Sequence, residues 1–289
     1  MGTVTAYDPR LSKEDERTSF GVCNFQAEVD MKTFSPIIAE GTTAIALAGG
    51  ISTAGADVSP AANASQAAGP VPVVVIVRVP KPWYAPRSVV VGKMRDTTPE
   101  YAKLPGLVFK AFSFERDSSD FGGIYFWRDR VSAEAWFNPA WFDRVRKERG
   151  AEARVRMFDA PVSVDNTIGG TPGDSKSKAV GTLVEIPIPA GVSRDRLSAE
   201  FTAAVPTYQK VPGLLRKHFI ISTNGTFGGV YLWKDEASAR AWFDETWHAR
   251  VVKTYGHDAK IEWFDTPILL PTENVANRVA AQALMGAAQ

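Results

Sequence analysis

The sequence predicts an α+β protein in which two ferredoxin-like (βαββαβ) repeats form one barrel within a single chain, preceded by a largely disordered N-terminal extension. Three observations predict it. A segment of the chain occurs twice. Each copy shows strand and helix signals in the order βαββαβ. One strand of each copy is apolar on both faces, so a single sheet with helices on one side would leave an apolar face uncovered.

The duplicated segment covers residues 104–161 and 211–267. One residue fewer between Phe219 and Phe227 is the only gap between the copies. A period of about a hundred residues is too long for a solenoid unit and corresponds to a whole small domain. The copies match in order at Pro105/Pro212, Gly106/Gly213, Phe112/Phe219, Gly122/Gly228, Gly123/Gly229, Tyr125/Tyr231, Trp127/Trp233, Asp129/Asp235, Trp136/Trp242, Phe137/Phe243, Trp141/Trp247, Arg144/Arg250, Phe158/Phe264 and Asp159/Asp265.

Each copy begins with a β-branched run that predicts a strand, and prolines close the run. A helical segment follows, which ends at a Pro-Gly pair because proline cannot continue a helix. The expected first strands are residues 73–77 and 182–186, and the expected helices are residues 87–103 and 194–210.

The second half of each copy predicts two strands joined by a polar hairpin loop, then a helix and a last strand. Asp129 and Asp235 are positioned to cap the helix at its start, and Gly150 and Gly256 to end it. The expected strands are residues 107–114, 123–127 and 153–158 in the first copy, and 214–221, 229–233 and 259–264 in the second.

The third strand of each copy carries apolar or aromatic residues on both faces, at residues 124–127 and 230–233. Its second face must therefore be covered, and the sheet of the other repeat is the economical cover. Two such sheets packed face to face form a closed or nearly closed barrel, which is usually built from two identical chains. Here one chain supplies both halves.

The repeated motif P-G-L-x-x-K-x-F, followed by F-G-G-[IV]-Y-[FL]-W-x-D-x-x-S-A-x-A-W-F, resembles the dimeric α+β barrel superfamily of small monooxygenases. The chain is most similar to the YdhR-like monooxygenases, near the antibiotic biosynthesis monooxygenase (ABM) group. The resemblance covers both duplicated segments and implies an intramolecular dimeric α+β barrel. It implies less about chemistry, because the superfamily also holds haem-degrading oxygenases, isomerases and proteins without an assigned reaction.

The expected domain organisation has an N-terminal extension over residues 1–69, a first repeat over 70–168 and a linker over 169–178. A second repeat over 179–272 and a C-terminal tail over 273–289 follow. Residues 31–56 resemble a short secretory signal, which would make the protein periplasmic or secreted if translation starts at Met31. The alternative is an extension without a targeting role and a cytoplasmic protein.

Charge and cysteine content exclude several functions. The formal net charge is +1 without a long basic run, so the electrostatic signature of a nucleic-acid-binding protein is missing. No stretch reaches the roughly 18 consecutive apolar residues of a membrane-spanning helix. The single Cys23 lies outside both repeats and excludes an internal disulfide and a cysteine-based zinc site.

The helix of each repeat that follows the hairpin carries an aromatic stripe, which we interpret as core: Ala133, Phe137, Trp141 and Val145, and Ala239, Phe243, Trp247 and Val251. Arg144 and Arg250 lie beside this stripe. A guanidinium there must reach solvent or pair with an acid, and Asp159 and Asp265 are candidate partners. The functional alternative places Arg250 beside an anionic phenolate or enolate, whose charge it would stabilise.

The histidines differ between the copies. His218 stands where the first repeat has Ala111, and it is the candidate general base because imidazole titrates near neutral pH. The alternative is a structural interior histidine. His248 is expected at a flanking or exposed position, and His257 in a solvated loop. No two histidines have metal-ligand spacing on one element, so no protein-built metal site is expected.

Aromatic side chains of the third strands alternate onto one face of each sheet. They either line an apolar pocket between the sheets or form sheet-on-sheet core. The candidate substrate-binding residues are Tyr231, Trp233, Phe264, Trp247, Tyr125 and Trp127. The Gly-Gly pairs at residues 122–123 and 228–229 precede strands rather than helices, so they indicate a bulge or close strand contact and not a phosphate loop.

The leading hypothesis is a cofactor-independent monooxygenase acting on an aromatic phenol or quinol and molecular oxygen, with His218 as base and Arg250 stabilising the anion. The resemblance implies that the substrate anion itself reduces oxygen. Two alternatives remain. One is a haem-binding oxygenase or peroxidase with His218 or His248 as axial ligand, and the other is a non-catalytic protein that binds an apolar ligand. The chain is expected to act as a monomeric pseudo-dimer, with further self-association as the open alternative.

Overall fold

The structure is a computed structural model that describes residues 70–118, 120–167 and 178–271. The expected signal-like segment 31–56, Cys23 and the C-terminal tail lie outside the described residues. The linker does too, except for Lys178. None of the described helices is long and apolar enough to cross a membrane.

Both repeats have the expected βαββαβ order, with additional breaks in the helices. The first repeat consists of β1 Val73–Val79, α1 Arg87–Asp96, α2 Thr98–Ala102, β2 Leu107–Glu115, β3 Phe121–Trp127, α3 Arg130–Trp136, α4 Pro139–Arg149 and β4 Arg154–Asp165. The second consists of β5 Val180–Pro187, α5 Arg194–Gln209, β6 Leu214–Ile221, β7 Thr226–Trp233, α6 Glu236–Trp242, α7 Glu245–Tyr255 and β8 Lys260–Pro271.

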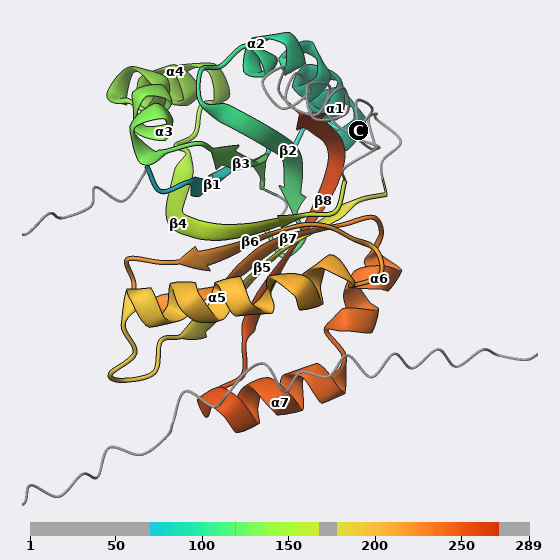
Figure 1. The fold of residues 1–289 in the computed structure, drawn as a ribbon. Helices are drawn as coiled ribbons and strands as arrows, with labels where there is room; N and C mark the ends of the chain where they lie inside the picture. Colours follow the sequence, from blue (N-terminus) through green and yellow to red (C-terminus); the bar gives the residue numbers. More distant parts are fainter. Residues whose placement is uncertain (1–69, 119, 168–177, 272–289) are drawn as a thin grey trace, which may run out of the picture. The chain divides into compact units, whose positions relative to one another are not determined.

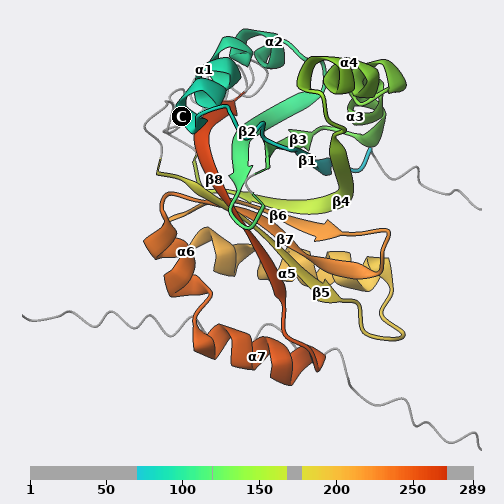
Figure 2. The same ribbon diagram turned by 180° about the vertical axis from the view of Figure 1, so that it is seen from behind.

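The eight strands close into one barrel in the order β1-β3-β2-β8-β5-β7-β6-β4 (Figures 1 and 2). Strands β4 and β8 are longer than expected, and their extra length closes the barrel. The first half of β4 pairs with β1 of its own repeat, and its second half pairs with β6 of the other. The first half of β8 pairs with β5 of its own repeat, and its second half pairs with β2 of the other. One chain thus forms both halves of a dimeric α+β barrel.

Alternation along the strands separates two apolar layers. One layer fills the barrel interior and takes residues from both repeats, among them Ile124, Phe126, Phe158, Val230 and Phe264. The other layer packs the outer strand faces against the helices, and in it the ends of β4 and β8 pack against helices of the other repeat. Each sheet is therefore covered on both faces, as the two-sided apolar strands predicted.

The third-strand aromatics face the helices and not the space between the sheets. Tyr125 and Trp127 pack with Phe137 and Trp141 of the first repeat. Tyr231 and Trp233 pack with Phe243 and Trp247 of the second, in an equivalent way. The predicted pocket between the sheets is wrong for these four residues. The smaller side chains on the opposite strand face fill the barrel instead.

The expected long helices are interrupted in three of four cases. An Asn-Pro or Asp-Glu step after Phe137 or Phe243 starts a new helix, and the Asn138 and Asp244 side chains accept hydrogen bonds from the backbone N–H groups of Trp141 and Trp247. In the first repeat Thr97 and Thr98 donate to carbonyls three residues earlier, which ends α1. The second repeat has Ala204 and Val205 there, and α5 continues through Pro206.

Ion pairs at Asp159 and Asp265 connect the two repeats. Asp265 accepts hydrogen bonds from Arg87 at 2.7 Å and from Arg116 at 2.8 Å, both in the first repeat. Asp159 accepts one from Arg130 at 2.7 Å and another from Arg194 of the second repeat. The prediction that Asp159 and Asp265 pair with Arg144 and Arg250 is therefore wrong. These carboxylates join the repeats instead.

Replacement of Gly228 with alanine is expected to lower the free energy of unfolding by about 2–5 kcal/mol. A Cβ there would lie 2.1 Å from the carbonyl oxygen of Val184 on the paired strand, at a backbone φ of +156°. A backbone atom cannot swing away as a flexible side chain can. The measurement is urea unfolding, with Gly92→Ala as control because nothing lies within 4 Å of that position. An equal, small effect of both changes would contradict the expected strand contact.

Candidate functional site

Each repeat buries one lysine on the helix-facing side of its sheet. Lys217 on β6 and Lys110 on β2 are each 2% exposed. Both belong to the repeated K-x-F sequence, and the aromatic two positions later lies on the same strand face. A buried ammonium without a paired charge is costly, so this placement is unusual for a structural lysine.

Three aromatic rings surround each lysine amine. The Nζ of Lys217 lies 3.2 Å from the ring centre of Tyr208, 3.7 Å from that of Phe219 and 4.7 Å from that of Tyr231. The Nζ of Lys110 is enclosed in the same way by Tyr101, Phe112 and Tyr125, at 3.0, 3.8 and 4.4 Å. The π-faces of the rings partly compensate a positive charge on the amine.

Burial lowers the pKa of Lys217 well below its usual value of 10.5. It lowers the pKa of Lys110 in the same direction, and the charge of Glu100 offsets part of that effect. Among the described residues, no carboxylate forms an ion pair with either amine. The site therefore favours a neutral amine, which can accept a proton.

The second glycine of each Gly-Gly pair makes room for the lysine. A Cβ on Gly229 would lie 3.0 Å from the Cε of Lys217 and 2.8 Å from the Tyr231 ring. A Cβ on Gly123 would meet the Cε of Lys110 at 3.0 Å. Close strand contact was the predicted role of these pairs. The structure confirms this close contact and shows that the second glycine also leaves room for the lysine side chain.

The tyrosines beside Lys217 keep their protons at neutral pH. Burial raises the pKa of Tyr208 to about 12 and that of Tyr231 well above 10.0. Their hydroxyl groups interact with each other. Two protonated phenol groups next to a neutral amine form a set of hydrogen-bond donors and one proton acceptor within an apolar wall.

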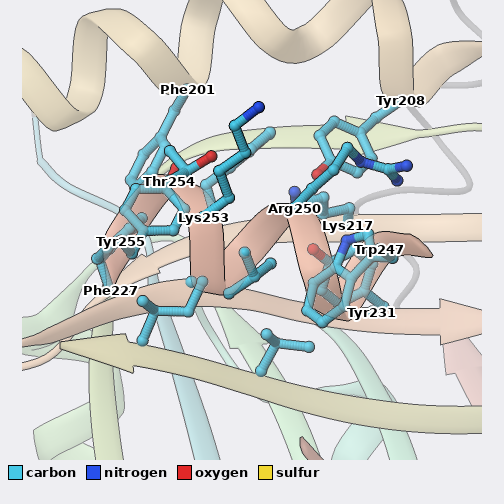
Figure 3. A pocket seen from close by; sticks show the side chains of 15 residues that line it. Phe201, Tyr208, Lys217, Phe227, Tyr231, Trp247, Arg250, Lys253, Thr254 and Tyr255 are labelled. Carbon is cyan, nitrogen blue, oxygen red and sulfur yellow. The ribbon is translucent and has the colours of Figure 1, made fainter. Parts of the chain in front are cut away.

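A pocket of about 150 Å³ opens between the outer face of the second-repeat sheet and helices α5 and α7. Figure 3 shows Lys217, Tyr231, Tyr208, Trp247 and Arg250 gathered at one end of it. Phe201, Phe227 and Tyr255 lie towards the other end. Arg250 comes from the exposed face of α7 and brings a guanidinium to an otherwise aromatic site. This is the pocket that we consider functional, and we call it the second-repeat pocket.

Among the predicted site residues, Tyr231, Trp247 and Arg250 line this pocket. Tyr125, together with Trp141 and Arg144, lines the corresponding pocket of the first repeat. Trp127 and Trp233 are buried core outside both linings, and the Trp233 Nε1 donates to the Thr182 hydroxyl at 3.2 Å.

His218 and Phe264 lie on the other side of the sheet, in the barrel. The His218 ring stacks on Phe126 of the first repeat at 3.8 Å between ring centres. Burial and the nearby Arg216 lower the pKa of His218 to about 3, and its Nε2 has no hydrogen-bond partner among the described residues. The prediction that His218, Phe264 and Arg250 share one pocket is wrong, because strand alternation places the first two on the opposite face from Lys217.

The remaining histidines and the pocket arginines occupy the positions that the sequence indicated. His248 is half-buried, and its Nδ1 lies 2.7 Å from a carboxylate oxygen of Asp258. His257 is exposed. Arg144 and Arg250 reach solvent, and within the described part of the chain neither forms an ion pair. The Arg144 guanidinium lies over the Trp136 ring at 5.5 Å.

The sequence reasoning missed the two lysines and the tyrosines Tyr101 and Tyr208. A signal was present, because the lysine is part of the motif repeated in both copies. Residue type alone does not reveal its burial, because a lysine in a strand usually points to solvent. Strand alternation places Lys217 and His218 on opposite faces, and the histidine is the one that faces the barrel.

Replacement of Lys217 with methionine is expected to raise the melting temperature by at least about 2 °C at neutral pH, the shift given by about 1 kcal/mol in a domain of this size. The pKa of Lys217 is lowered in the folded protein and lies near 10.5 in the unfolded chain. At pH values between these two, Lys217 is protonated in the unfolded chain but not in the folded protein. Stability of the native protein therefore falls as pH falls through that window, and the variant loses this fall. Thermal unfolding from neutral pH to about pH 10 measures it.

The exposed Lys147 is the matched control, since Lys147→Met removes a lysine that lies in solvent. It should leave the pH dependence of melting unchanged. A Lys217→Met protein with the same pH dependence as the native protein would contradict the lowered pKa.

No protein-family model matches the chain, and no curated protein matches its sequence. Solved structures do match. A protein of Fusobacterium nucleatum described as a "putative monooxygenase" has a TM-score of 0.53 at 13% identity, over 71% of this chain and 96% of its own. A protein of Lactobacillus acidophilus with the same description has a TM-score of 0.49 at 10% identity, over 70% of this chain and 96% of its own. At 13% identity, the likeness to the Fusobacterium nucleatum protein concerns the fold alone, and it agrees with the barrel topology.

Proposed function

We propose that the protein is a monooxygenase that oxidises an electron-rich phenol or quinol with molecular oxygen, without a cofactor, in the second-repeat pocket. One observation carries the proposal. Lys217 places a buried amine with a lowered pKa, without an acidic partner among the described residues, in an aromatic pocket that an arginine flanks. The fold shared with a protein described as a monooxygenase supports the same reaction class by analogy.

Lys217 would act first as the general base. Its neutral Nζ accepts the phenolic proton, and the resulting ammonium stays beside the phenolate. The three rings around Nζ stabilise that ammonium as it forms. Deprotonation therefore converts a neutral amine and a neutral phenol into a buried ion pair, and binding of an acidic substrate is coupled to proton transfer.

The oxygen chemistry then belongs to the substrate. The phenolate delocalises its charge onto a ring carbon that carries hydrogen and passes one electron to oxygen, after which superoxide and the substrate radical form a C–O bond. The Lys217 ammonium returns its proton to the peroxide. Loss of water breaks the O–O bond and leaves a carbonyl on that carbon. One oxygen atom enters the product and the other leaves as water, so atoms and electrons balance.

The other pocket groups hold the anion. The Arg250 guanidinium adds positive charge at the end where Lys217 lies, and the protonated Tyr208 and Tyr231 hydroxyls donate hydrogen bonds. Trp247 and Phe219 supply flat apolar walls that exclude water. In such an apolar site, fixed charges and dipoles act on the phenolate more strongly than they would in water.

The haem alternative fits this pocket poorly. His218 and His248, the two axial-ligand candidates, do not line it. His218 lies in the barrel against Phe126, and His248 is engaged with Asp258.

The test is oxygen consumption by purified protein with 2,6-dimethoxyphenol and 2,6-dimethylphenol, two single-ring phenols with a hydrogen-bearing carbon opposite the hydroxyl. With ¹⁸O₂, the quinone product should carry one labelled oxygen atom, and added chelator should leave the rate unchanged. Saturable binding of these phenols without oxygen uptake would contradict the enzyme and favour a binding protein. Activity that requires added haem would contradict cofactor independence.

A further inference from the structure

The first repeat contains a pocket at the equivalent place that is more than twice as large. Its volume is about 370 Å³, compared with about 150 Å³ in the second-repeat pocket. It lies between the outer face of β1–β3 and helices α1, α2 and α4. We call it the first-repeat pocket. Its size differs although the surrounding elements correspond.

The chemical groups of the two pockets are the same. Lys110, Tyr101, Tyr125, Trp141 and Arg144 line the first-repeat pocket. They correspond to Lys217, Tyr208, Tyr231, Trp247 and Arg250 in the second. The amine is caged by aromatic rings in both cases. Both pockets can therefore receive the same functional group, an acidic hydroxyl on an aromatic ring.

Two substitutions between the repeats account for the difference in size. The second-repeat pocket is narrowed by Phe201 and Tyr255, which pack on Phe227 at ring-centre distances of 6.3 and 5.2 Å. The first repeat has Met94 and Arg149 at these positions. The Arg149 side chain is exposed, with its guanidinium over Phe121 at 6.0 Å. A thioether and an outward guanidinium leave open the space that two rings fill in the other repeat.

The helix break enlarges the first-repeat pocket further. The polypeptide leaves the helical path at Thr97, and Thr97 itself lines the pocket. In the second repeat the uninterrupted α5 closes over that region. Tyr84 and Val89 extend the apolar wall on the solvent side of the first-repeat pocket, and both are more than half exposed.

We propose that the first-repeat pocket is a second binding site that accepts a polycyclic aromatic compound carrying an acidic hydroxyl, whereas the second-repeat pocket takes only a single ring. A dry cavity of about 150 Å³ holds one benzene ring. A cavity of about 370 Å³ has room for two or three fused rings by the same measure. Met94 and Arg149, against Phe201 and Tyr255, determine the difference. The inference rests on the lysine chemistry of the proposed function, but it concerns binding and not turnover.

The experiment is a stoichiometric titration under argon, so that no oxidation occurs, with 4-nitrophenol as the single-ring probe and 2-hydroxyanthracene as the three-ring probe. The native protein should bind two equivalents of 4-nitrophenol and one of 2-hydroxyanthracene. Met94→Phe with Arg149→Tyr should remove the 2-hydroxyanthracene equivalent. Phe201→Met with Tyr255→Arg should add a second one.

Retention of at least one equivalent of 4-nitrophenol shows that each double variant is folded and keeps a working pocket. Two equivalents of 2-hydroxyanthracene on the native protein would overturn the proposal. The same is true of no binding, or of one equivalent that survives Met94→Phe with Arg149→Tyr. Any of these results can occur while phenol oxidation continues, and loss of oxidation alone leaves the binding result intact. The two proposals therefore fail separately.

Discussion

Replacement of Lys217 with methionine is expected to lower phenol turnover by about 10²–10⁴-fold, the usual contribution of a positioned general base. Methionine keeps the length and apolar stem of the buried chain but removes the amine. The comparison is made in a Lys110→Met background, so that the equivalent lysine of the first repeat does not contribute. The measurement is the initial rate of oxygen uptake with 2,6-dimethoxyphenol.

The pH profile gives the same prediction a second readout. The active form has a neutral Lys217, so activity should rise with pH through the pKa of this amine, which burial places well below 10.5. His218→Phe is the matched variant on the opposite face of the same strand. If turnover is lost in His218→Phe and kept in Lys217→Met, the base is the histidine and the lysine assignment is wrong.

Replacement of Phe264 with alanine is expected to lower the free energy of unfolding by about 3–5 kcal/mol without changing ligand affinity. Phe264 is 1% exposed and lies in the barrel interior among side chains of both repeats. Its removal leaves a cavity where the two half-sheets meet. Urea unfolding measures the loss, and 4-nitrophenol titration under native conditions measures affinity.

Trp247→Leu is the complementary variant because Trp247 lines the second-repeat pocket. It should weaken binding of 4-nitrophenol to that pocket. A Phe264→Ala protein that is as stable as the native protein but binds the phenol more weakly would return Phe264 to the pocket wall, where the sequence had placed it.

The fold could be predicted because its signals are redundant. The duplicated motif established two equal units, and the order of strands and helices established their topology. The apolar third strands showed that both faces of each sheet must be packed against other elements. What remained hidden was the extra length of β4 and β8, whose final residues pair across repeats. Sequence alternation alone does not indicate which partner a strand end will choose.

The site was harder to predict because a strand with two apolar faces has no polar side to orient it. Tyr231 and Val230 are both buried, so composition does not decide which of the two faces the helices. The lysine of the K-x-F sequence was the informative residue. A cation on a fully covered strand must lie where something compensates or uses it, and the repeated Gly-Gly pair provides its space.

The differences between copies also indicated something other than first expected. His218, which corresponds to Ala111, was the candidate base because imidazole titrates near neutral pH, but its ring stacks inside the barrel. The differences that shape the pockets are Met94 in place of Phe201 and Arg149 in place of Tyr255. These positions lie outside the P-G-L-x-x-K-x-F and F-G-G stretches, so comparing those stretches did not single them out.

The most direct test of the lysine base is the absorption spectrum of bound 4-nitrophenol at a pH below the pKa of the free phenol. In Lys110→Met protein, the bound probe should show the yellow phenolate band, because Lys217 takes its proton. In the Lys110→Met, Lys217→Met protein the probe should bind as the colourless phenol. A bound probe that stays neutral in the first protein, or ionises equally in both, would contradict the account.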